Sequence, residues 1–202
     1  MLLMASFIYA QEPLENSALD ELIELRLEFL EKDLSSEDLF RLGSLYFVLE
    51  LYRNAADYYA IAAKQLEKKL SPETKTMISI TYYNRGLALF SLELYDSAKS
   101  MFKRSFENND TLIDALRMLG TVFFIEKNKI ETLKYWEQYL ALAPESMEHS
   151  LIEDAVEKLK NPKFQFPEAD DILENQDNPA WPFLNPDTIP YPESYYQRKR
   201  VV

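Results

Sequence analysis

The sequence predicts an all-α protein built from helical repeats, and three observations support this fold class. The 202 residues include only three glycines, and no Asn-Gly or Asp-Gly pair marks a β-hairpin turn. The three glycines, Gly43, Gly86 and Gly120, each stand in the same local pattern of aromatic and small residues. On both sides of this pattern, apolar residues recur every three or four positions, as they do in amphipathic helices.

The composition narrows the classes of function. Apolar residues make up 47% of the chain, enough for a core, and the formal net charge is −12. We expect no binding to nucleic acid, because the one basic run, Arg198-Lys199-Arg200, is short. Cysteine is absent and His149 is the sole histidine, which excludes disulfides, thiol nucleophiles and zinc sites of the Cys/His type. We therefore expect neither a metal nor a cofactor.

Residues 1–11 are apolar but too few to span a bilayer. They resemble the end of a secretory signal cut after Ala10, although a basic n-region is missing and Ile8 is not the small residue expected two positions before the cut. The alternative is an apolar turn packed on the first helix. The first interpretation predicts an exported, periplasmic protein and the second a cytoplasmic one. No transmembrane segment is predicted.

Residues 12–34 are predicted to form an acidic, amphipathic helix. Residues 1–35 hold eight acidic and two basic side chains. Within residues 16–33, five apolar side chains share one stripe of a helix: Leu19, Leu22, Ile23, Leu27 and Leu30. The acidic side chains lie largely off this stripe, which predicts one apolar and one charged face.

Residues 35–144 contain an internal repeat centred on the three glycines. Relative to each glycine, an aromatic residue or Leu stands at position +3, a small residue at +12 and an aromatic residue at +16. The residues at +12 are Ala55, Ala98 and Thr132, and those at +16 are Tyr59, Phe102 and Trp136. Gly86 and Gly120 are 34 residues apart, whereas Gly43 and Gly86 are 43 apart, so the first interval holds nine extra residues.

These offsets and the 34-residue period resemble the tetratricopeptide-repeat (TPR) family over residues 36–144. The resemblance implies three antiparallel helix pairs, at about 36–70, 79–109 and 113–144, stacked as a right-handed α-α superhelix, or solenoid. It also implies close packing of each glycine on the small residue at +12, which pairs Gly43 with Ala55, Gly86 with Ala98 and Gly120 with Thr132. The chain departs from the pattern at Arg85, where the other repeats have Leu, and at Lys129, where they have Tyr.

In this family a partner binds in a concave groove lined by the first helix of each repeat, at positions −3, +1 and +4 from the glycine. Carried over to this chain, the groove residues are Phe40, Ser44, Phe47, Tyr83, Leu87, Phe90, Arg117, Thr121 and Phe124. This set is largely apolar and is expected to form an interaction surface. The alternative is that the chain's own tail or neighbouring helices cover it.

One subclass of the family grips a peptide's terminal carboxylate with Lys, Asn and Arg. At the clamp positions this chain has Asn84, but the others are Phe40, Ser44, Asp114 and Met118. This clamp is therefore not expected, and Asn84 is interpreted as a helix-surface amide. His149 is interpreted as a surface residue, since a lone histidine forms no metal cluster.

Capping residues mark the predicted helix starts. These are Ser35 or Ser36, Ser71 before Pro72, Asp110 for the third pair and Ser146 after Pro144. Residues 64–70 are expected to extend the second helix of the first pair, so that the nine extra residues form a ridge.

A capping helix and a tail complete the predicted organisation. Residues 145–160 combine an apolar stripe with acidic residues, which suits the polar outer face of a terminal repeat. Residues 161–202 hold seven of the ten prolines and are expected to be extended. The tail also carries aromatic side chains that the repeats or a partner should bury: Phe164, Phe166, Trp181, Phe183, Tyr191, Tyr195 and Tyr196.

The sequence favours binding over catalysis. The repeats use all three glycines, which leaves none for a phosphate loop, and no serine lies in a nucleophile-elbow motif. We expect a non-catalytic scaffold or adaptor that binds another protein or a peptide through the groove, within a larger assembly. Two alternatives remain: residues 179–200 are the partner-binding motif and the repeats anchor it, or the chain is a regulatory domain of an enzyme complex. Self-association through the groove is also left open.

Overall fold

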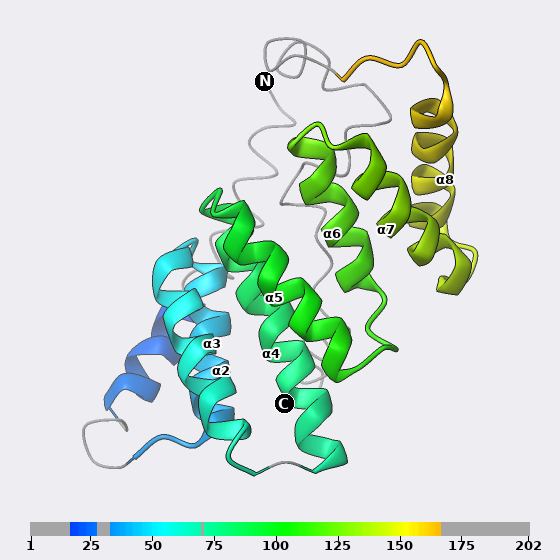
Figure 1. The fold of residues 1–202 in the computed structure, drawn as a ribbon. Coiled ribbons are helices and arrows are strands. Elements are labelled where there is room, and N and C mark those ends of the chain that lie inside the picture. Colours follow the sequence, from blue (N-terminus) through cyan, green and yellow to red (C-terminus); the bar gives the residue numbers. More distant parts are fainter. Residues whose placement is uncertain (1–16, 28–32, 70, 167–202) are drawn as a thin grey trace, which may run out of the picture. The chain divides into compact units, whose positions relative to one another are not determined.

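The computed structural model describes residues 17–27, 33–69 and 71–166, and these residues form helices and turns without a strand (Figure 1). The described part of the chain is therefore all-α, as predicted. After a helix at residues 17–27 come α2 (Ser36–Val48), α3 (Tyr52–Leu66), α4 (Pro72–Ser91), α5 (Tyr95–Asn108), α6 (Asp114–Ile125), α7 (Lys129–Leu142) and α8 (Met147–Lys160). The chain divides into two compact units, Met1–Val122 and Phe123–Val202.

In the first unit, helices that follow one another in sequence also pack together. Helix α2 packs on α3, α3 on α4 and α4 on α5 (Figure 1). In the second unit, α7 packs on α8. The described residues therefore form helical hairpins, the element that the internal repeat predicts.

The helix of residues 17–27 is held against α2 by polar contacts. Arg41 Nε donates to Glu21 Oε1 at 2.5 Å, and Arg26 Nη1 donates to the hydroxyl of Tyr46 at 3.3 Å. Its buried apolar residues are Ala18, Leu22 and Leu25. Three of the residues predicted to share the packed stripe, Leu19, Ile23 and Leu27, are instead 47%, 50% and 59% exposed. The helix carries apolar side chains on more than one face, so the pattern alone did not identify the buried face.

Three serine caps begin helices where they were expected. Ser35 and Asp38 form a capping box before α2, and Ser71 and Thr74 form one before α4. Ser146 Oγ accepts the amide N–H of His149 at the start of α8.

The expected start at Asp110 was wrong, because α6 begins at Asp114. The amide and the hydroxyl of Thr111 both donate to Asn109 Oδ1, at 3.1 and 2.7 Å. This local turn at Asn109 takes the place of a helix start at Asp110. The extra residues between the first two glycines also differ from expectation: α3 ends at Leu66, and α4, with 20 residues, takes up the added length.

The turn after each first helix has the same geometry in three places. Glu50, Glu93 and Lys127, each seven residues after a repeat glycine, have φ angles of 57°, 58° and 56°. Each of their amides donates to the carbonyl three residues earlier, at 3.0, 2.9 and 2.9 Å. The next amide donates to the carbonyl five residues earlier, at 2.8, 2.9 and 2.8 Å. This is the Schellman arrangement that reverses a chain after a helix, so the sequence repeat is also a repeat of backbone geometry.

Two of the glycines make room for an aromatic ring. A Cβ at Gly43 would lie 2.7 Å from Tyr59 Cδ1, and one at Gly86 would lie 2.6 Å from Phe102 Cε1. The ring at position +16 therefore occupies the space beside the glycine, where the small residue at +12 was expected. Ala55 and Ala98, at +12, are fully buried.

Candidate functional site

The ten predicted groove residues lie on α2, α4 and α6, and most of them are buried. Phe40 and Phe47 on α2 are half-buried. The other eight are at most 8% exposed: Ser44, Tyr83, Asn84, Leu87, Phe90, Arg117, Thr121 and Phe124. An open apolar groove at these positions therefore stays a prediction, and Asn84 is not the surface amide that was expected.

The aromatic groove residues pack against rings of the following helix. At position −3, Phe40 pairs with Tyr59 and Tyr83 with Phe102, with ring centroids 5.4 and 5.8 Å apart. At position +4, Phe47 pairs with Tyr52 and Phe90 with Tyr95, at 5.1 and 5.8 Å. Ring pairs at these distances stabilise a fold beyond the area that they bury. The residues thus join the two helices of a hairpin, whatever else they contact.

The polar groove residues are also held by neighbours within the chain. The hydroxyl of Ser44 donates to the carbonyl of Phe40 and accepts from the hydroxyl of Tyr59, both at 3.1 Å. On α6, Thr121 donates to the carbonyl of Arg117 at 3.0 Å. Arg117 Nε pairs with Asp114 Oδ1 at 3.0 Å, although the arginine side chain is 7% exposed. These contacts hold the polar side chains in place.

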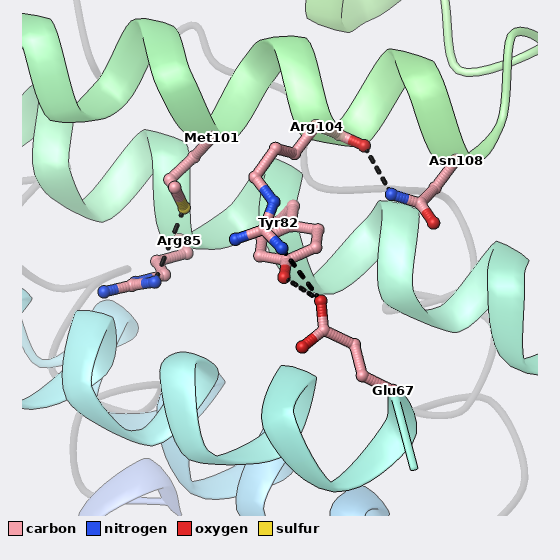
Figure 2. Close-up of polar contacts among 6 residues, drawn as sticks. All are labelled: Glu67, Tyr82, Arg85, Met101, Arg104 and Asn108. Carbon is pink, nitrogen blue, oxygen red and sulfur yellow. Dashed lines mark hydrogen bonds and ion pairs between the residues drawn. The ribbon is translucent and has the colours of Figure 1, made fainter. Parts of the chain in front are cut away.

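A polar cluster that the sequence did not reveal links three helices of the first unit (Figure 2). Glu67, just after α3, accepts a short hydrogen bond from the hydroxyl of Tyr82 on α4. The same carboxylate oxygen accepts from Arg104 Nη2 on α5 at 2.9 Å. The Arg104 guanidinium also lies over the Tyr82 ring, 4.2 Å from its centroid. We call Glu67, Tyr82 and Arg104 the Glu67 cluster.

The Glu67 cluster holds Tyr82 in its protonated form. Burial, followed by the hydrogen bond to Glu67, raises the pKa of Tyr82 to about 12. A phenol with this pKa donates a hydrogen bond at neutral pH and cannot serve as a base. The arginine and the carboxylate are both partly exposed, so the cluster is suited to joining α3, α4 and α5. Beside it, Arg85 donates from Nη1 to the sulfur of Met101 at 3.5 Å (Figure 2).

The third hairpin completes its ring packing with residues from beyond α8. Phe124, at position +4, stacks on Trp136 with centroids 5.4 Å apart. Its ring also meets Phe166 edge-on at 5.3 Å and Phe164 at 6.5 Å. Lys129, which replaces the aromatic residue of the first two repeats, donates from Nζ to the carbonyl of Asn161 at 3.3 Å. The start of the tail is thus bound to the second unit.

No set of three or more acidic or histidine side chains within the described residues is placed to hold a metal ion. His149 is half-buried at the start of α8. Among the described helices, none is long and apolar enough to cross a bilayer.

Several predicted features lie outside the described residues. They are residues 1–11, part of the acidic helix 12–34, and the tail contacts Trp181, Phe183, Tyr191, Tyr195 and Tyr196. The localisation and the tail motif therefore stay predictions.

Comparison with known proteins adds no identification. No family model matches the chain, and no curated protein matches it.

Proposed function

We propose that this chain is a non-catalytic scaffold of the TPR type, a solenoid of helical repeats that binds another protein through the first-helix face. The observation that carries this proposal is the threefold recurrence of one turn at a fixed distance from each repeat glycine. A chain that repeats its hairpin unit at this geometry can stack those units, and stacked helical repeats commonly present extended binding surfaces. A role within a larger assembly follows from the same reasoning.

The accessible part of the predicted groove lies on α2. Phe40 and Phe47 are half-buried, and their rings pack against Tyr59 and Tyr52 respectively. Partly exposed aromatic side chains are favoured at protein interfaces because they bury a large apolar area with little loss of conformational entropy. These two side chains are the first place to look for a partner.

A second candidate is that the tail motif at residues 179–200 makes the contact and the repeats anchor it. Two observations favour it: eight of the ten groove residues are buried, and Phe164 and Phe166 bind the start of the tail to the third hairpin. The tail is then a tethered arm whose motif is available at high local concentration. The two candidates place the site on different residues and can be separated by experiment.

Site-specific photo-crosslinking in the native cell tests both candidates. A photoreactive residue replaces Phe47, Tyr195 or, as a control on the exposed surface of α3, Asp57. The groove proposal expects one specific polypeptide to crosslink at Phe47 and not at Asp57. Crosslinking at Tyr195 alone would favour the tail motif. Absence of a specific adduct at both Phe47 and Tyr195 would contradict the proposed function.

A further inference from the structure

The ring at position +4 has an aromatic partner in each of the three hairpins, but the source of that partner changes. In the first two, Tyr52 and Tyr95 come from position +9 of the same hairpin. In the third, position +9 is Lys129, and Phe124 is met by Phe164 and Phe166. These two rings lie edge-on to one another, 5.1 Å apart. An aromatic-x-aromatic segment thus occupies the face of Phe124.

Within the part of the chain that the structure describes, the segment that carries these rings is held by the ring contacts and by hydrogen bonds at Asn161. Residues 164–166 follow α8 without helix or turn structure, and both phenylalanines are half-buried. The backbone near them is fixed by a local bond from the amide of Phe164 to the carbonyl of Asn161 at 3.1 Å. Lys129 adds an exposed hydrogen bond to that same carbonyl. Segments with so little buried surface open at low free-energy cost, and their release leaves the helices intact.

Phe124 itself belongs to the stable part of the hairpin. It is 8% exposed, stacks on the fully buried Trp136 and lies just before the Schellman turn at Lys127. A fixed ring flanked by a readily released pair of rings is a preformed receptor with an exchangeable ligand.

We propose that the face of Phe124 is a docking site for an extended aromatic-x-aromatic peptide segment. The chain fills this site with its own Phe164 and Phe166, and a partner's segment of the same chemistry displaces them. This inference rests on the proposed function, since it names the kind of polypeptide bound at one of the predicted groove residues. Recognition is by ring packing against Phe124, supplemented by the Lys129 ammonium as a donor to a backbone carbonyl of the segment.

The test uses the full chain with both tail rings removed, Phe164→Ala together with Phe166→Ala. The probe is a fluorescent peptide that copies residues 161–166. Removing the internal competitor should tighten binding of this peptide by about tenfold or more over the unchanged chain, because a tethered segment competes at an effective millimolar concentration. The same peptide with both phenylalanines changed to alanine should not bind. Helical circular dichroism confirms that the variant remains folded.

A third substitution locates the site. Lys129→Tyr supplies the ring that the first two hairpins carry at this position. This ring should pack against Phe124 in place of the peptide. Added to the two alanine substitutions, it should weaken peptide binding by about tenfold or more. The matched control, Lys129→Ala, removes the ammonium donor without adding a ring and should weaken peptide binding much less than Lys129→Tyr does.

Three outcomes would overturn the inference: no peptide binding to the folded double variant, equal binding to the variant and the unchanged chain, or binding that survives Lys129→Tyr. The proposed function can be judged separately, because crosslinking at Phe47 does not depend on the Phe124 site. Crosslinking of a partner at Phe47 together with failure of the peptide test would support the proposed function and contradict the docking site at Phe124.

Discussion

At the scale of single residues, the glycines of the repeat are explained by the rings beside them. Tyr59 and Phe102 are 1% and 0% exposed, so neither can move aside freely when a methyl group is added to Gly43 or Gly86. Alanine favours a helix interior by about 1 kcal/mol over glycine, but overpacking a core costs about 1–3 kcal/mol. The steric effect should win.

We therefore predict that Gly43→Ala and Gly86→Ala each destabilise the fold by about 1–2 kcal/mol, measured by denaturant unfolding. Combining Gly86→Ala with Phe102→Leu should cost less than the sum of the single changes, since the smaller side chain leaves space for the methyl group. An increase in stability on either glycine substitution would show that the ring does not restrict this position.

The Glu67 cluster predicts that the free energy of unfolding depends on pH at high pH. The folded-state pKa of Tyr82 is raised to about 12 from the ordinary value of 10.0. A group with a raised folded pKa contributes stability that is fully present below pH 10 and is lost as the pH rises toward 12. Tyr82→Phe should destabilise the protein by about 1 kcal/mol at neutral pH, and the difference from the unchanged chain should shrink between pH 10 and 12. A difference that stays constant over this range would contradict the assignment. Tyr135→Phe serves as the control.

At the scale of elements, each of the three Schellman turns places a non-glycine residue in a left-handed backbone conformation that favours glycine. Glu50, Glu93 and Lys127 have left-handed φ angles, which cost a non-glycine residue about 1 kcal/mol or more. Replacing each of these residues by glycine removes the strain. The larger conformational entropy of glycine in the unfolded chain offsets part of this gain in stability. We predict that Glu50→Gly, Glu93→Gly and Lys127→Gly each stabilise the protein by about 0.5 kcal/mol, measured as a rise in denaturation midpoint. Glu93→Ala should give no such rise.

Helix positions followed from the sequence where a local rule sufficed. The caps at Ser35, Ser71 and Ser146 depend on side chains within three residues, and they were predicted correctly. The start of α6 was not, because Asn109 forms a competing local turn whose strength a cap rule does not measure. The same limit applies to α3 and α4, where the nine extra residues could lengthen either helix.

Side-chain partners were harder to predict because they depend on contacts distant in sequence. The register of the repeat located Tyr59 and Phe102 at +16, yet it did not tell which residue lies beside the glycine. Glu67 lies among the extra residues, outside any repeated position, so nothing in the pattern marked its bonds to Tyr82 and Arg104. For Phe164 and Phe166 the sequence predicted burial by the repeats or by a partner, but nothing in the repeat pattern identified Phe124 as the ring that they contact.

At the scale of the whole molecule, the start of the tail supplies part of the packing of the second unit. Phe164 and Phe166 pack against Phe124. A chain ending at Phe166 keeps both rings, whereas a chain ending at Lys160 should lose their packing on Phe124. Both shortened chains lack Trp181, so Trp136, which stacks on Phe124, is their single tryptophan and reports on this unit alone.

We predict that Trp136 fluorescence in the chain of residues 1–166 shows unfolding at a higher denaturant concentration than in residues 1–160. The two half-buried rings should contribute about 1–2 kcal/mol to the free energy of unfolding. Each aromatic pair adds about 0.5–1.5 kcal/mol beyond the contribution of the area that it buries. The longer chain with Phe164→Ala and Phe166→Ala should behave like the shorter one, which separates the rings from the added backbone. Equal midpoints for the two lengths would mean that the rings merely rest on Phe124, and the docking site inferred there would then lack the affinity to hold a segment.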